Sequence, residues 1–181
     1  MKVTTKTIVT NGLMIALVFL ATRFTAIPGP IAPGYINLGD VVIMAAAIIM
    51  GSRTGFIAGA FGSMLADIAY SAFIYAPITF IVKGLEGYVV GKIASRENTG
   101  NKSFYIKNAV AAIIGAVVMV AGYFLTEAFI LSFIDSTFGY TYAISNLPMN
   151  LVQGGLSTVV GYLFANILLK VNLKMNLFTS I

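Results

Sequence analysis

The sequence contains neither cysteine nor histidine among its 181 residues, and only 9% of its residues are charged. Metal sites built from Cys or His, thiol chemistry and imidazole proton relays are therefore excluded. No G-x-x-x-x-G-K-[ST] pattern is present, so the chain does not hydrolyse ATP through a P-loop. An intramembrane enzyme using Lys83 or Glu86 has few catalytic options left. We expect a protein that is not an enzyme and that has no metal and no cofactor.

Apolar residues dominate the chain, with 59% hydrophobic residues and a mean hydropathy of +0.94. Long apolar runs between short polar connections are typical of helical membrane proteins, and this length allows about six spans of roughly 20 residues. We predict an all-α integral membrane fold, a compact six-transmembrane-helix bundle forming one domain over residues 1–181. The spans are expected at about 7–23, 39–52, 54–72, 77–94, 105–133 and 146–170.

Basic residues gather on one side of this predicted bundle. The other side holds only Arg23, whereas the first side holds Lys2, Lys6, Arg53, Lys92, Arg96, Lys102, Lys107, Lys170 and Lys174. The positive-inside rule then places both termini in the cytoplasm. We expect a multi-pass protein of a bacterial plasma membrane, surrounded by lipid. The net charge of +5 would indicate nucleic acid only in a soluble protein, so no nucleic-acid partner is expected.

The segment Pro77–Gly91, PITFIVKGLEGYVVG, is apolar enough for a bilayer but carries Lys83 and Glu86 one helical turn apart. Ionisable residues inside a span are costly, so they usually face the protein interior, pair, and mark a ligand or ion path. With a rise of about 1.5 Å per residue, Lys83 lies roughly 9 Å below the outer end of its span and Glu86 lies near the midplane. A purely structural ion pair remains the alternative.

The other polar residues of the predicted spans lie at similar depth or further outward. Asp40 opens the second span, and Glu127 lies near the outer end of the fifth. Asn146, Asn150 and Gln153 recur at i, i+4 and i+7, which places them on one helix face. The inner half has essentially no ionisable residue, whereas an ion pathway would need polar groups at every depth. The pattern therefore indicates a pocket that is open outward and sealed below.

We predict that this pocket binds a small molecule. Helix-dipole stabilisation of Asp40 and interhelical hydrogen bonding by the Asn/Gln stripe are the simpler alternatives. Asp67, in the glycine-rich third span, is assigned to packing rather than to the site. Because acidic groups outnumber Lys83 in the outer half, a neutral or weakly basic polar aromatic ligand is favoured. The candidate site residues are Asn37, Asp40, Tyr75, Lys83, Glu86, Tyr88, Glu127, Asn146, Asn150 and Gln153.

Two further segments have predicted roles. Residues Phe24–Leu38 hold three prolines and two glycines and cannot form a helix, so we expect a lid or binding loop, with a plain linker as the alternative. Gly12 and Ala16 have the small-xxx-small spacing that allows a second helix to approach closely. They are the candidate partner-docking residues, unless they are ordinary small residues of a helix.

These features resemble the S component of energy-coupling-factor (ECF) vitamin transporters. The resemblance rests on six short spans, the Pro-rich loop leading to YINLGD, the Gly-rich third span and PITFIVKGLEG, and it covers nearly the whole chain. It is nearest to the subgroup associated with hydroxymethylpyrimidine, pyridoxine or riboflavin. The AxxxA-type contact of the family is matched only loosely, by Gly12 and Ala16.

The resemblance implies a bundle that captures a vitamin on the outer side beneath its first loop. It also implies partners: a membrane T component and two cytoplasmic ATPases, which supply the energy. Pyridoxine or hydroxymethylpyrimidine is the favoured substrate. The alternatives are a riboflavin-specific S component, a stand-alone secondary carrier and a structural subunit that binds no small molecule.

Overall fold

The computed structural model describes residues 4–29, 35–96 and 101–175, with side chains up to Val171. These parts of the chain contain six α-helices: α1 (Thr5–Phe24), α2 (Gly39–Met50), α3 (Ser52–Ala69), α4 (Ala76–Ile93), α5 (Lys102–Leu125) and α6 (Tyr140–Met175). A π-helical turn, Thr126–Ile130, and a 3-10 turn, Leu131–Phe133, follow α5. The predicted all-α fold is confirmed.

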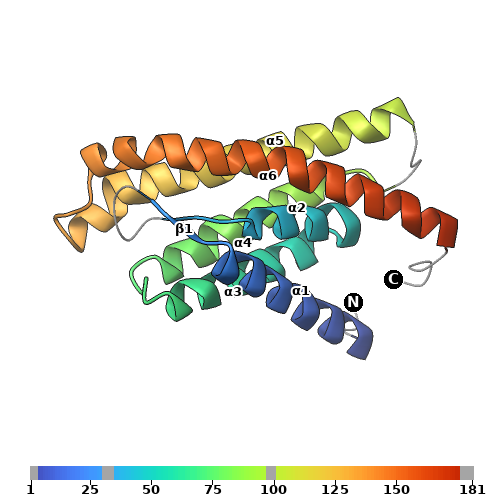
Figure 1. Ribbon diagram of the computed structural model, residues 1–181, viewed down its shortest axis with the longest axis horizontal. Helices are drawn as coiled ribbons and strands as arrows, with labels where there is room; N and C mark the ends of the chain where they lie inside the picture. Colours follow the sequence, from blue (N-terminus) through green and yellow to red (C-terminus); the bar gives the residue numbers. More distant parts are fainter. Residues whose placement is uncertain (1–3, 30–34, 97–100, 176–181) are drawn as a thin grey trace.

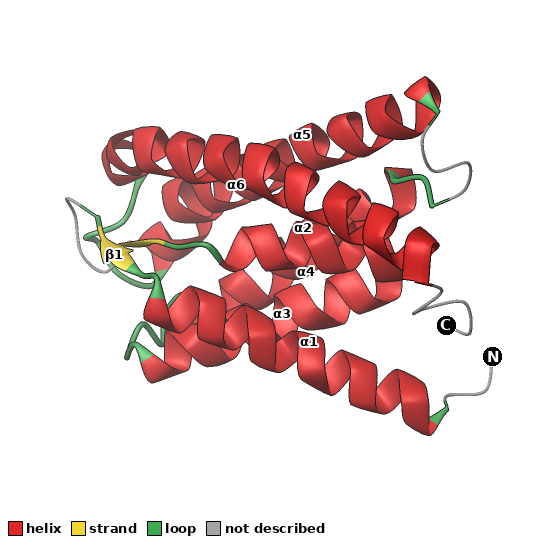
Figure 2. Cartoon of the chain, turned by 45° about the vertical axis from the view of Figure 1, so that its right-hand side comes forward, coloured by secondary structure: helices red, strands yellow, loops and turns green. Residues whose placement is uncertain are grey.

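The helices form one bundle with two recognisable ends (Figure 1). The start of α1, the end of α4, the start of α5 and the end of α6 lie at one end, which we call the terminal end. At the other, the hairpin end, β1 (Ile27–Pro28) pairs antiparallel with β2 (Tyr35–Ile36). The sequence did not predict this short hairpin within the Pro-rich segment. Figure 2 shows that apart from the hairpin the described chain is helix and short connections.

Helix lengths differ strongly across the bundle. Three stretches are long and apolar enough to cross a membrane: Thr5–Phe24, Lys102–Phe133 and Tyr140–Val171. By contrast, α2 has 12 residues and rises only about 18 Å, less than the roughly 30 Å hydrocarbon core. Yet α2 is the most enclosed helix, because most of its residues are buried between its neighbours. The short helix therefore belongs to the protein interior rather than to the lipid-facing shell.

Glycine residues bring α3 and α4 into backbone contact. A Cβ atom at Gly55 would meet the carbonyl oxygen of Gly87, and one at Gly59 would meet the carbonyl oxygen of Lys83. Small residues at such positions let helix backbones approach closely in membranes. The carbonyl of Lys83 packs directly on α3, which fixes the height at which the Lys83 side chain leaves α4.

The start of the last helix corrects the sequence analysis. A connection was expected as far as residue 145, with the helix beginning at Asn146, but α6 begins at Tyr140. Proline is favoured in the first turn of a helix, and Pro148 would lie in the first turn of a helix that began at Asn146. Instead Gly139, with φ of +146°, makes the turn, and Pro148 lies inside the helix. The aromatic residues Tyr140 and Tyr142 are therefore helical.

Candidate functional site

A cavity of about 50 Å³ lies inside the hairpin end of the bundle. It is lined from α1, the hairpin segment, α3, α4, α5 with its π-turn, and α6. The lining residues are Thr22, Gly29, Tyr35, Asn37, Ser63, Asp67, Tyr75, Thr79, Lys83, Tyr123, Glu127, Asn146, Met149, Asn150 and Gln153. Almost every segment that reaches this end thus contributes a polar group to one enclosed space.

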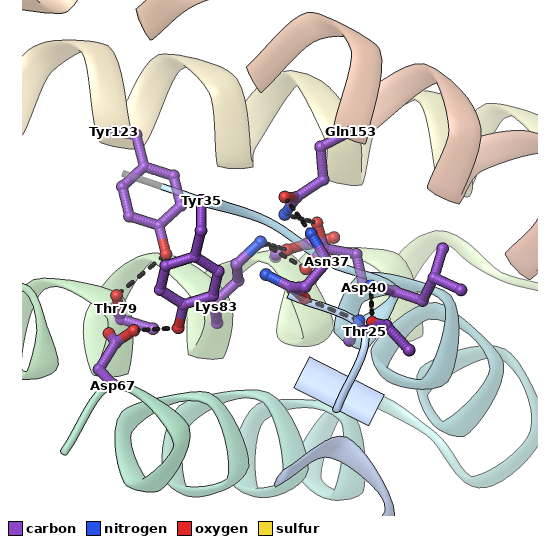
Figure 3. A network of polar contacts seen from close by, with 12 residues as sticks. Thr25, Tyr35, Asn37, Asp40, Asp67, Thr79, Lys83, Tyr123 and Gln153 are labelled. Atoms are coloured by element: carbon purple, nitrogen blue, oxygen red, sulfur yellow. Dashed lines mark hydrogen bonds and ion pairs between the residues drawn. The ribbon is translucent and has the colours of Figure 1, made fainter. Parts of the chain in front are cut away.

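The floor of the cavity is a buried ion-pair cluster. Lys83 Nζ donates a hydrogen bond to Asp40 Oδ1 and lies 3.5 Å from Glu86 Oε2. Gln153 Nε2 donates to the other oxygen of Asp40 at 2.7 Å. Figure 3 shows Asp40, Lys83 and Gln153 converging from α2, α4 and α6. Asp40 and Glu86 therefore compensate the charge of Lys83, and Lys83 does not make the cavity positive.

The same glutamine fixes the hairpin segment. The backbone N–H of Asn37 donates to Gln153 Oε1 at 3.0 Å, and Asn37 Oδ1 accepts from the N–H of Gly39 at 2.8 Å. A further bond, from the N–H of Leu38 to Thr25 Oγ1 at 2.8 Å, ties the segment to the end of α1. One side-chain amide thus joins the segment over the cavity to the ion pair under it.

One wall is built around Tyr35 and Asp67. The Tyr35 hydroxyl donates to Asp67 Oδ1 at 2.5 Å, and its ring stacks on Tyr70 with centroids 4.9 Å apart. Arg23 lies over the far side of the stack, 4.6 Å from the Tyr70 centroid. Burial, and then the charge of Asp67, raises the pKa of Tyr35 far above its ordinary value. The phenol therefore stays a hydrogen-bond donor at physiological pH.

The opposite wall is built around Glu127 in the π-helical turn. Its Oε1 accepts hydrogen bonds from the Tyr75 hydroxyl at 2.8 Å and from Asn146 Nδ2 at 3.2 Å. The hydroxyls of Tyr75 and Tyr142 lie 3.2 Å apart. A π-turn often occurs at functional sites because it re-aims a side chain within a helix. Here it places a carboxylate among neutral donors.

Several polar atoms of the lining are buried but have no hydrogen-bond partner among the described residues. These are two carboxylate oxygens, an amide nitrogen and a hydroxyl: Asp67 Oδ2, Glu127 Oε2, Asn150 Nδ2 and Thr22 Oγ1. Buried polar groups in proteins are nearly always paired, and each exception needs an explanation such as a ligand or water. The cavity therefore offers acceptors and one amide donor to a guest molecule.

The structure brings most of the predicted site residues together. The cavity lining includes Asn37, Tyr75, Lys83, Glu127, Asn146, Asn150 and Gln153. Asp40 and Glu86 lie directly behind it, through their contacts with Lys83. Whether these residues contact a ligand stays a prediction.

Tyr88 corrects the predicted set. Its side chain is 40% exposed on the outer surface of the bundle, beside Lys92 and away from the cavity. Tyr88 follows Lys83 by five residues, which turns it about 140° around the helix axis. Tyr88 was a candidate because an aromatic side chain could stack on a flat ligand ring, but its position on the helix turns it away from the cavity.

Eight of the fifteen lining residues were not in the predicted set, and three of them show why. Asp67 was assigned to packing, but it faces the cavity and holds Tyr35. Thr79 lies one turn from both Tyr75 and Lys83 on the same face, so its spacing could have revealed it. Tyr35 gave no such signal, because its partner is 32 positions away along the chain.

The predicted docking pair lies on the open surface of α1. Gly12 and Ala16 are both exposed, and a Cβ atom at Gly12 would meet nothing within 4 Å. This face has room for a partner helix, and its role stays a prediction.

Comparison with known proteins decides the family. Residues 2–170 match the family described as ECF-type riboflavin transporter, S component. The chain belongs to this family. A relative from Lactococcus lactis subsp. cremoris, the thiamine precursor transporter HmpT, is 29% identical over 154 residues, covering 84% of this chain and 79% of its own. An uncharacterized protein of Pyrococcus woesei is 33% identical over 145 residues, covering 80% of this chain and 88% of its own.

Membership of this family establishes the general role of the chain. ECF S components bind a small vitamin and work in the membrane with a T component and ATPases, and they are not a class of enzymes. This S component is a membrane protein and a substrate-binding subunit for vitamin uptake. The resemblance read from the Pro-rich loop, the Gly-rich span and PITFIVKGLEG is confirmed.

Proposed function

We propose that this S component captures hydroxymethylpyrimidine, or a similar single-ring nitrogen heterocycle such as pyridoxine, in the cavity at the hairpin end. The observation that supports this most is the unpaired oxygen Glu127 Oε2, which lines the cavity together with the unpaired nitrogen Asn150 Nδ2. A carboxylate acceptor and an amide donor in the lining of one cavity are complementary to an aminopyrimidine edge, where an exocyclic amine donates and a ring nitrogen accepts.

The register of α6 supports pairing these two groups. Asn146 donates to Glu127 Oε1, and Asn150 lies one turn further along the same face of α6. One turn rises about 5.4 Å, so a single ring can reach Glu127 and Asn150 together. Tyr35, Tyr75 and Tyr123 supply aromatic surfaces around the ring.

The charge and the volume of the cavity also favour a small heterocycle. Lys83 is compensated by Asp40 and Glu86, whereas Asp67 and Glu127 face the cavity without a cation within ion-pairing distance among the described residues. A neutral or weakly basic ligand therefore fits better than a polyanion. The enclosed volume of about 50 Å³ holds a few water molecules, which favours one ring over three.

Riboflavin is the second candidate, because the family description names a riboflavin transporter. Its tricyclic ring and ribityl chain would require the hairpin segment to move away from Gln153 and Asp67. The similarity to HmpT, a thiamine precursor transporter, supports the smaller ligand instead.

We further propose six spans with both termini in the cytoplasm, and delivery of the substrate through a T component and two cytoplasmic ATPases. The excess of Lys and Arg in the segments on one side of the predicted spans supports this orientation. Gly12 and Ala16 on the open face of α1 are the proposed docking residues. A stand-alone carrier remains the alternative, and transport by the purified protein in liposomes without partners would favour it.

The test is mass spectrometry of small molecules that co-purify in mild detergent, followed by calorimetric titration with hydroxymethylpyrimidine, pyridoxine and riboflavin. Hydroxymethylpyrimidine should bind most tightly. Glu127→Gln should weaken the binding of hydroxymethylpyrimidine roughly 10- to 150-fold, because a hydrogen bond to a charged group contributes about 1.5–3 kcal/mol. The melting temperature of the Glu127→Gln variant should stay near that of the wild type.

Asp135→Asn is the matched control, since Asp135 is an exposed carboxylate at the same end. It should leave binding unchanged. Tight riboflavin binding that is insensitive to Glu127→Gln would support the second candidate. No binding of any of the three compounds would refute the assignment.

A further inference from the structure

Two buried side chains of the cavity lining have no part in the proposed contacts with the aminopyrimidine edge. Thr22 in α1 and Asp67 in α3 are only 2% and 3% exposed, and both line the cavity. Thr22 Oγ1 and Asp67 Oδ2 have no hydrogen-bond partner among the described residues. Glu127 and Asn150 lie on the π-turn and on α6, so the cavity has a second group of available polar atoms on its α1–α3 side.

The packing of α1 against α3 brings Thr22 and Asp67 to nearly the same height. A Cβ atom at Gly62 would lie 2.7 Å from Val18 Cβ, so the two helices touch at these residues. Both helices end at the hairpin end of the bundle. Thr22 lies four residues beyond Val18 and Asp67 five residues beyond Gly62, which raises them about 6 Å and about 7.5 Å above this contact.

Gly39, the first residue of α2, leaves room for the Thr22 hydroxyl. A Cβ atom at this position would collide with Thr22 Oγ1 and with Asn37 Oδ1. The backbone of α2 therefore lies directly against the hydroxyl and leaves little space beside it. A single small substituent of a ligand fits next to Thr22 better than the edge of a ring does.

The available atoms of Thr22 and Asp67 are complementary to a hydroxyl group. A hydroxyl donates one hydrogen and accepts through its lone pairs, so it satisfies a carboxylate oxygen and a threonine hydroxyl together. The other carboxylate oxygen, Asp67 Oδ1, already accepts from Tyr35 at 2.5 Å. The Thr79 hydroxyl interacts electrostatically with Asp67, but it forms a hydrogen bond of 3.0 Å with the Tyr123 hydroxyl. The carboxylate is thus held in place with one oxygen left for a ligand.

On the basis of the proposed function, in which Glu127 and Asn150 bind the nitrogen-bearing edge of the ring, we propose that Thr22 and Asp67 form a subsite for a hydroxymethyl substituent of the same ring. The substituent donates its hydrogen to Asp67 Oδ2 and accepts from Thr22 Oγ1. A site built to hydrogen-bond a hydroxyl rejects the analogue that lacks it, because the buried polar groups of the site then stay unpaired. The subsite therefore selects hydroxymethyl-bearing heterocycles over their methyl analogues.

The test is calorimetric titration of the purified protein with hydroxymethylpyrimidine and with the analogue that carries a methyl group in place of the hydroxymethyl group. We expect the wild type to bind hydroxymethylpyrimidine at least about tenfold more tightly than the analogue. Thr22→Val, which replaces the hydroxyl by a methyl group, should lower this ratio about fivefold by weakening hydroxymethylpyrimidine alone. Thr22→Ser retains the hydroxyl and should retain the ratio.

Thermal unfolding separates this role from a structural one. The melting temperature of Thr22→Val should not fall, because the hydroxyl that it removes has no partner among the described residues of the ligand-free protein. Thr158→Val is the matched control, since Thr158 is a half-buried threonine of α6 outside the cavity. It should leave both affinities unchanged.

The two ligands also separate this subsite from the pairing at Glu127. Glu127→Gln should weaken both compounds and leave their ratio unchanged. Equal affinity of the wild type for the two compounds would overturn the subsite and leave the pairing with Glu127 and Asn150 in place. Equal weakening of both compounds by Thr22→Val would show that Thr22 contacts the ring or shapes the cavity, and would also overturn the subsite. Binding of neither compound would overturn the proposed function and the subsite together.

Discussion

The two ends of the bundle bury similar polar residues, but these residues differ in whether their polar atoms have hydrogen-bond partners. At the terminal end, Asn108 Oδ1 accepts from the N–H of Ser95 at 2.8 Å and Asn108 Nδ2 donates to Asn166 Oδ1 at 3.2 Å. Asn166 Nδ2 in turn donates to the carbonyl of Tyr162 at 2.7 Å. At the hairpin end, Glu127 and Asn150 each keep an atom without a partner among the described residues.

This difference separates structural polar groups from those available to a ligand. A closed network of buried hydrogen bonds specifies how helices pack and offers nothing to a guest. Arg96 adds to the closed end, because its Nη2 donates to the carbonyls of Ala47 in α2 and Gly91 in α4. The Asn108–Asn166 network and Arg96 at the terminal end therefore use their polar atoms for packing, whereas the cavity at the hairpin end keeps polar atoms available to a ligand.

The largest effect is expected at the junction of the two ends, from Lys83→Met. This change leaves Asp40 and Glu86 as buried carboxylates without their cation. Removing one partner of a buried ion pair costs about 3–5 kcal/mol. Thermal unfolding in detergent should show a strongly lowered melting temperature.

Two further variants serve as controls for the Lys83→Met experiment. Lys107→Met, on the exposed side of α5, should change stability by no more than about 0.5 kcal/mol. Adding Asp40→Asn to Lys83→Met should restore part of the loss, because one buried charge is removed. If the Lys83→Met protein were as stable as the wild type but no longer bound hydroxymethylpyrimidine, Lys83 would have a ligand-binding role rather than a structural one.

Periodicity along single helices explains what the sequence could predict. The stripe Asn146, Asn150 and Gln153 was found because three positions on one helix share a face, and all three line the cavity. Lys83 was found because a charge in an apolar span needs a partner. Such signals are local, so they hold without knowledge of how the helices pack.

Contacts between distant segments could not be predicted in this way. Asn108 and Asn166 are 58 positions apart, and no residue between them indicates that they meet. Tyr35 reaches Asp67 only because the β-hairpin turns the segment back over the bundle. These pairings depend on the three-dimensional path of the chain, which one sequence does not contain.

The comparison of the two ends predicts opposite outcomes when an asparagine is replaced by alanine at one end or at the other. Asn108→Ala leaves the Ser95 N–H and Asn166 Oδ1 without their partner, so it should cost about 1–3 kcal/mol of stability. Hydroxymethylpyrimidine affinity should not change. Asn150→Ala should weaken affinity roughly 5- to 10-fold, since one neutral hydrogen bond contributes about 1 kcal/mol, with little change in stability.

Melting temperatures and calorimetric titrations of both variants measure this contrast. Asn101→Ala serves as the neutral reference, because Asn101 is exposed and its side chain makes no cap hydrogen bond. If Asn108→Ala weakened binding as much as Asn150→Ala does, the terminal end would not be independent of the site.

The smallest effect is expected from Tyr35→Phe, which removes only the hydroxyl that donates to Asp67. The ring can still stack on Tyr70, so the wall keeps its shape and loses one hydrogen bond. We expect a three- to tenfold faster release of hydroxymethylpyrimidine in stopped-flow measurements, with an unchanged association rate. Tyr70→Phe is the matched control, because the Tyr70 hydroxyl has no hydrogen-bond partner among the described residues and its ring contacts would remain. Equal release rates for both variants and the wild type would show that the Tyr35–Asp67 bond does not hold the ligand, and would leave Glu127 and Asn150 as the anchoring pair.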